Sequence, residues 1–358
     1  MRLENQYTSR LDFLDALRAV AALAVILQHG LELSIPGFMV WTTRNFSFGQ
    51  AGVCLFFLIS GFIIPLSLEK SGSNIRFWWR RFWRLFPLYW FSIGLICFCY
   101  AVRLGGSFDN QMGQTRVWLV NLSMLQEFFG QPHVLSVFWT LTVELVLYLV
   151  CSLLFALGLL SRTTLLLGVV LAAYAILGSA GLFWSIPLGK GRVFLLLTAL
   201  IGMATQCYLA GRLPGKTLMA AVCVLFVGLG VTIISVSRRG VFVQEFETSG
   251  LLASWASAYV IFTGGVLVRD RRMSPSLLWC GRVSYSLYLL HPIVVAVTPR
   301  SWPAWAFVPA VVSGSFAASA LTYPLVERTG IAFGRFLEHR WLPFRVAKSA
   351  PEPVRAAA

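Results

Sequence analysis

Long apolar segments recur along the whole chain, and they constrain its fold more than any other feature. Segments of about 17 to 25 apolar residues can cross a bilayer as helices, whereas transmembrane β-strands alternate polar and apolar residues over about ten positions. The chain has 358 residues, of which 58% are hydrophobic and only 12% charged, against about 25% charged in soluble domains. The sequence therefore predicts an all-α, polytopic membrane helix bundle.

We predict about ten transmembrane helices in a single domain spanning residues 1–335. The tail, residues 336–358, is basic and rich in Pro and Ala, and we expect it to be cytoplasmic and disordered. The predicted spans are 14–31, 49–68, 84–102, 136–157, 164–184, 193–210, 217–236, 251–268, 282–298 and 304–325.

The net charge is +15, and the basic residues that produce it lie in the loops between these spans. With the N-terminus inside, 20 of the 29 basic residues fall on the cytoplasmic side, eight fall outside and one lies in the first span. The positive-inside rule therefore favours cytoplasmic N- and C-termini in a multi-pass inner-membrane protein. This distribution argues against nucleic-acid binding. The seven cysteines have neither CxxC pairing nor a histidine cluster, so we expect no metal site.

Arg18 and His29 are the most informative pair of residues. They are eleven residues apart, which places them on one helical face and about 16 Å apart along the axis. Ionisable groups inside a membrane usually face a cavity or a partner. His29 can serve as a general base, and the alternative is a structural histidine. Arg18 can bind a ligand or simply pair with Asp15 one turn earlier.

Two further segments offer groups for ligand binding. In the second span, GQAGVCLFFLISGFIIP (49–65), the small residues Ser60 and Gly61 allow close approach of a ligand or, alternatively, of another helix. In RFWWRRFWRLFPLYW (76–90), Arg81 and Arg84 lie on one helical face. They can bind phosphates as an anion clamp or anchor the helix at the membrane surface.

The fourth and ninth spans also contain polar side chains. Glu144 lies in an apolar span, where a carboxylate needs a partner or a proton. It is a candidate site residue, for example to orient His29, with Trp139 and Tyr148 within about one helical turn. In GRVSYSLYLLHP (281–292), Tyr285 and His291 are candidate substrate-binding residues, and a structural role is the alternative for His291.

Together these motifs resemble the membrane acyltransferase-3 family, which O-acylates bacterial glycans and related acceptors. The resemblance rests on the arginine and histidine at 18 and 29, on GVCLFFLISGFII, RRFWRLFPLYW, FWTLTVELVLY and GRVSYSLYLLHP, and on the later PLVE. It extends from Leu11 to about Arg335.

This resemblance implies an acyl-CoA donor that enters from the cytoplasm and a carbohydrate acceptor such as exopolysaccharide, O-antigen or a lipid-linked sugar. It implies that His29 activates the acceptor hydroxyl, and that Arg18, Arg81 and Arg84 bind the donor or hold the site together. Acetyl is the expected acyl group. A proton-coupled transporter is the alternative, because intramembrane His and Glu also form proton relays. A membrane scaffold without enzymatic activity is the third hypothesis.

Overall fold

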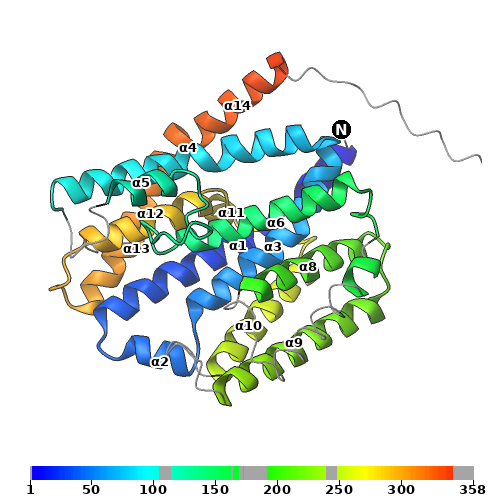
Figure 1. Ribbon diagram of the computed structural model, residues 1–358, viewed down its shortest axis with the longest axis horizontal. Coiled ribbons are helices and arrows are strands. Elements are labelled where there is room, and N and C mark those ends of the chain that lie inside the picture. The colour runs from blue at the N-terminus through cyan, green and yellow to red at the C-terminus, as the bar shows by residue number, and fades with distance from the viewer. Residues whose placement is uncertain are drawn as a thin grey trace, which may run out of the picture.

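The computed structural model of the chain describes residues 2–104, 114–162, 164–168, 172, 192–238 and 248–341. The described residues form helices and loops without β-strands (Figure 1), which confirms the predicted all-α class. The N-terminal half contains α1 (Arg2–Ser34), α2 (Phe38–Arg44), α3 (Phe48–Ser71), α4 (Asn74–Ala101), α5 (Thr115–Asn121) and α6 (Phe138–Ala156). The C-terminal half contains α8 (Arg192–Leu209), α9 (Gly215–Arg238), α10 (Thr248–Leu267), α11 (Pro275–Arg282), α12 (Ser284–Val297), α13 (Ala304–Thr322), the π-helix η2 (Tyr323–Glu327) and α14 (Arg328–Trp341).

Among the described residues, seven helices are long and apolar enough to cross a bilayer, or eight if the bent pair α11–α12 forms one span. Most of the predicted span 164–184 falls outside the described residues. Residues Gly215–Val231 of α9 are also apolar. The chain is thus a multi-pass membrane helix bundle, while ten spans and cytoplasmic termini stay predictions.

Helix α3 lies at the centre of the bundle and contacts α1, α4, α6, α8 and α10. Glycines allow its backbone to approach α8 closely. A Cβ atom added to Gly61 would lie 1.8 Å from the carbonyl oxygen of Ala199, and one added to Gly202 would lie 2.1 Å from that of Leu58. Small residues of this kind let membrane helices pack backbone against backbone. Gly61 is therefore a packing residue of the α3–α8 contact.

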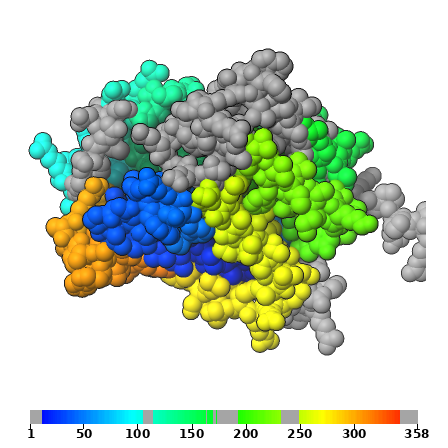
Figure 2. Space-filling model, turned by 90° about the horizontal axis from the view of Figure 1, so that it is seen from below, coloured from blue at the N-terminus to red at the C-terminus, as the bar shows by residue number. Residues whose placement is uncertain are grey.

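Helix α1 packs between α3 and the C-terminal helices α11, α12 and α13. Figure 2 shows the blue N-terminal segment flanked by the orange C-terminal segment on one side and by yellow and green segments on the other. This central position brings polar side chains of α1 close to those of several other helices.

Two helices extend beyond the predicted spans. α4 begins at Asn74, ten residues before the predicted start at 84, so the arginine-rich segment belongs to the same continuous helix. The helical run Ala304–Trp341 has 38 residues, or about 57 Å of helix, and exceeds the roughly 30 Å hydrocarbon core. Its last part packs on α4, where Arg80 forms a two-pronged ion pair with Glu338.

Helix α12 covers nearly all of the predicted span 282–298, and a bend at its start joins it to α11. α11 and α12 meet at a bend of 68° near Val283. Immediately before the bend, a Cβ atom on Gly281 would lie 2.0 Å from the carbonyl oxygen of Asp15, so α11 approaches the α1 backbone through a glycine. The bend directs the first residues of α12 toward the interior of the bundle.

Candidate active site

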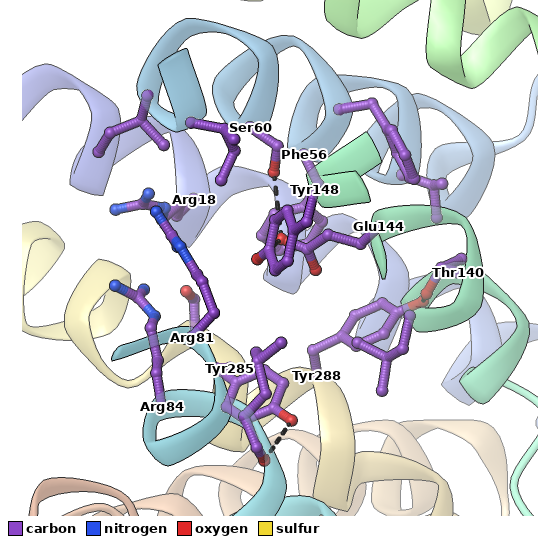
Figure 3. Close-up of a pocket in the computed structure, with 17 residues that line it drawn as sticks. Arg18, Phe56, Ser60, Arg81, Arg84, Thr140, Glu144, Tyr148, Tyr285 and Tyr288 are labelled. Atoms are coloured by element: carbon purple, nitrogen blue, oxygen red, sulfur yellow. Dashed lines mark hydrogen bonds between the residues drawn. The ribbon is translucent and has the colours of Figure 1, made fainter. Parts of the chain in front are cut away.

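One cavity of roughly 760 Å³, counting its open mouth, lies where α1, α3, α4, α6 and α12 meet. Figure 3 shows that arginines gather on one side of it and that Glu144 lies across from them. Seven of the site residues predicted from the sequence line this cavity: Arg18, Ser60, Arg81, Arg84, Glu144, Tyr148 and Tyr285. Residues more than 260 positions apart in the chain thus meet at one site.

The arginine side of the cavity is strongly cationic. Arg18 donates a hydrogen bond of 2.7 Å to Asp15, so it pairs within its own helix and also lines the cavity. The guanidinium of Arg81 lies over the ring of Tyr148, 5.1 Å from its centroid. Within the described part of the chain, no carboxylate lies within ion-pair distance of Arg81 or Arg84. This arrangement favours an anionic ligand.

Glu144 faces this cluster from α6. Its Oε1 accepts a hydrogen bond of 2.5 Å from the hydroxyl of Tyr148 and a longer one of 3.5 Å from that of Ser60. Tyr148 is almost completely buried, so its hydroxyl stays close to the carboxylate. These contacts give one oxygen of the Glu144 carboxylate hydrogen-bond partners inside an apolar span. The carboxylate beside His29 is instead that of Glu32.

Two tyrosines of α12 form the wall opposite α3. The hydroxyl of Tyr285 donates to the carbonyl oxygen of Leu85 at 2.9 Å. The hydroxyl of Tyr288 shares a hydrogen bond of 2.8 Å with that of Thr140 on α6. Both tyrosines reach the cavity because α12 starts at the bend after α11. The Thr140–Tyr288 hydrogen bond joins α6 to α12 at this wall (Figure 3).

His29 and His291 lie one layer behind this wall. Neither ring is among the groups that line the cavity. Their rings stack with centroids 5.4 Å apart and planes at 21°, and His291 packs edge-on against Tyr288 at 5.9 Å. His291 is fully buried, whereas the side chain of His29 is 38% exposed. The structure therefore links the histidines to the cavity through the Tyr288 ring.

The remaining nominated residues lie elsewhere. Gly61 packs against α8 as described above, and Trp139 is partly buried against the hydrophobic core. Glu32 was not predicted as a site residue, although the sequence indicates that it lies next to His29. It follows His29 by three residues, the spacing at which helical side chains meet, and its Oε2 lies 3.8 Å from His29 Nδ1.

A separate polar cluster holds the loop before α6. Glu127 of this loop forms an ion pair with Arg192 at the start of α8, and Gln126 forms a hydrogen bond of 2.9 Å with His133. Burial lowers the pKa of His133, and the nearby Glu127 opposes that shift. The cluster ties the loop to α8 and lies outside the cavity.

Comparison with known sequences identifies the family. The Acyl_transf_3 model, described as an acyltransferase domain, matches residues 11–326. The chain belongs to the acyltransferase-3 family. This assignment confirms the resemblance seen in the motifs and favours an enzyme over a transporter.

Three relatives illustrate the range of the family. Nodulation protein 10 of Rhizobium leguminosarum bv. viciae is 26% identical over 88% of this chain and 91% of its own length. The exopolysaccharide production protein ExoZ of Rhizobium meliloti is 28% identical over 82% and 93%. The peptidoglycan O-acetyltransferase OatA of Listeria monocytogenes is 28% identical over 80% of this chain and 50% of its own length. No solved structure matches the chain. This chain combines the acyltransferase-3 domain with several membrane-spanning helices, so it is a membrane-bound O-acyltransferase.

Proposed function

We propose that this chain transfers an acyl group, most simply acetyl, from acyl-CoA to a hydroxyl of a surface glycan or a glycolipid at the inner membrane. The observation that carries the proposal is the cavity into which Arg18, Arg81 and Arg84 project, two of them without a carboxylate partner among the described residues. Two relatives, one an exopolysaccharide production protein and one a peptidoglycan O-acetyltransferase, support a glycan acceptor and an acetyl group.

The arginines suit the phosphates of coenzyme A. A guanidinium donates two parallel hydrogen bonds to a phosphate, and its charge persists at all physiological pH values. Arg81 and Arg84 would bind these phosphates at the mouth of the cavity, with Arg18 contributing charge from α1. Their location before the apolar part of α4 fits a donor that arrives from the cytoplasm.

The thioester then has to reach His29. Arg18 and His29 are eleven residues apart on α1, which corresponds to about 16 Å of helix, and the long, thin pantetheine arm suits such a path. In the structure, Thr140 and Tyr288 line the cavity and are joined by a hydrogen bond, and the Tyr288 ring packs against His291. We propose that the arm displaces the Tyr288 ring when the donor binds.

His29 supplies the base for the transfer. Its imidazole accepts the proton of the acceptor hydroxyl while the hydroxyl oxygen attacks the thioester carbonyl. The carbon–sulfur bond then breaks, and the coenzyme A thiolate takes the proton from His29. The products are the O-acyl ester and free coenzyme A, with His29 neutral again. This direct transfer requires no covalent acyl-enzyme intermediate.

Two measurements test the proposal. Mass spectrometry of surface glycans from cells with and without the gene should show one acyl group per repeat that depends on the protein. Coenzyme A should raise the melting temperature of the purified protein, because a ligand that binds only the folded state stabilises it. An unchanged glycan together with no thermal stabilisation by coenzyme A would contradict the proposal.

A further inference from the structure

The carboxylate of Glu32 lies beside the ring of His29. Glu32 Oε2 is 3.8 Å from His29 Nδ1, one helical turn further along α1. The side chain of Glu32 is only 9% exposed, less than that of His29 at 38%. A largely buried carboxylate is costly unless other groups hydrogen-bond to it. Its position next to the histidine therefore needs an explanation.

A network of hydrogen bonds fixes this carboxylate. Glu32 Oε1 accepts hydrogen bonds from Gln28 Nε2 at 2.8 Å and from the Thr42 hydroxyl at 2.7 Å. The Gln28 side-chain oxygen accepts in turn from the Ser47 hydroxyl at 3.0 Å and from the backbone N–H of Gly49. Side chains and backbone of α1, α2 and the start of α3 thus hold one carboxylate in place.

The two oxygens of Glu32 have different surroundings. Oε1 accepts the hydrogen bonds from Gln28 and Thr42, whereas Oε2 faces His29. In structures without substrate, catalytic hydrogen bonds are often longer than in the reacting complex. A separation of 3.8 Å can shorten to a hydrogen bond through a small rotation of the imidazole. On the other side, the stacked ring of His291 limits the orientation of His29.

We propose that Glu32 is the positioning residue of His29. Its carboxylate accepts a hydrogen bond from the Nδ1–H group, which selects the tautomer whose Nε2 is free to act as the base. When Nε2 takes the proton of the acceptor hydroxyl, the same carboxylate stabilises the imidazolium that forms. This is the general logic of a base oriented by a third group. The inference rests on the proposed function, in which His29 is the base.

Glu32→Gln tests this role, because the amide preserves size while removing the charge. We expect kcat for acyl transfer to fall about 100-fold or more, within the range that general acid–base catalysis contributes. KM for acyl-CoA and the thermal stabilisation by coenzyme A should be unchanged. The double variant with His29→Ala should be no slower than His29→Ala alone, because Glu32 acts through that histidine.

The matched control is Glu69→Gln. Glu69 also lies on a membrane helix and also pairs with a partner, Arg212 at 3.3 Å, but outside the cavity. We expect Glu69→Gln to retain the wild-type kcat. If Glu32→Gln retains the wild-type kcat while His29→Ala is inactive, the positioning role is wrong and the proposed function stands. The positioning role is also wrong if Glu32→Gln lowers kcat further in the His29→Ala background. It is likewise wrong if the loss of kcat in Glu32→Gln is explained entirely by a smaller amount of folded protein. An active His29→Ala variant would instead contradict the proposed function.

Discussion

The imidazole of His291 stacks on that of His29, with 5.4 Å between ring centroids and 21° between ring planes. His291 is completely buried, and its Nδ1 approaches the Leu287 carbonyl oxygen at 3.3 Å. Its Nε2 has no hydrogen-bond partner in the described part of the chain. A buried polar atom without a partner costs about 1–3 kcal/mol. An apolar residue here would avoid this cost, so a histidine at this position is better explained by function than by stability.

The variant His291→Phe separates the contribution of His291 to stability from its contribution to function. Phenylalanine keeps a ring against His29 but removes both nitrogens. We expect an unchanged or higher melting temperature, because the unpaired nitrogen is lost, and at least about a tenfold lower rate of transfer, equivalent to roughly 1.4 kcal/mol of barrier. Thermal unfolding and initial-rate assays on the same detergent-purified protein measure both. A less stable variant with the wild-type rate would show that His291 serves only packing.

Arg84→Gln tests donor binding at the cavity mouth. Loss of a hydrogen bond from a charged group costs about 1.5–3 kcal/mol, so KM for acyl-CoA should rise about 10- to 150-fold. The shift in melting temperature caused by coenzyme A should shrink accordingly. Arg80→Gln is the matched control, because Arg80 lies on the same helix but binds Glu338 outside the cavity. Equal KM values for acyl-CoA in the two variants would show that Arg84 does not bind the donor.

Gly61→Ala tests whether this glycine serves packing. A Cβ atom at Gly61 would lie 1.8 Å from the carbonyl oxygen of Ala199, so α3 and α8 would have to separate. We expect a large loss of thermal stability and of folded protein. Gly94→Ala in α4 is the control, because no atom lies within 4 Å of its added Cβ. It should gain up to about 1 kcal/mol from helix propensity. A stable Gly61→Ala protein with a raised KM for acyl-CoA would instead support a ligand-lining role.

The sequence alone predicted the helical class and the charged residues that line the cavity. Apolar segment length is a local property, and charged residues inside such segments have few alternatives to a shared polar site. For this reason Arg18, Arg84 and Glu144 were found as candidates, and the structure brings them together in one cavity.

Features that depend on tertiary contacts were not predictable in this way. The bend between α11 and α12 coincides with the contact of Gly281 with the Asp15 carbonyl group, some 266 residues away in the chain. The separation of His29 from the cavity depends on where the Tyr288 ring packs. By contrast, Glu144 and Tyr148, four residues apart, and His29 and Glu32, three residues apart, each lie on a single helix, so the sequence spacing could indicate both pairings.

The most direct test of the account is acyl transfer by the His29→Ala variant. The purified variant and the wild type would be supplied with acetyl-CoA carrying a labelled acetyl group and with the host glycan, and the labelled ester would be measured over time. We predict that His29→Ala is folded, retains thermal stabilisation by coenzyme A and forms ester at least about 100-fold more slowly than the wild type. Ester formation at the wild-type rate by a folded His29→Ala protein would contradict the central claim that His29 is the base.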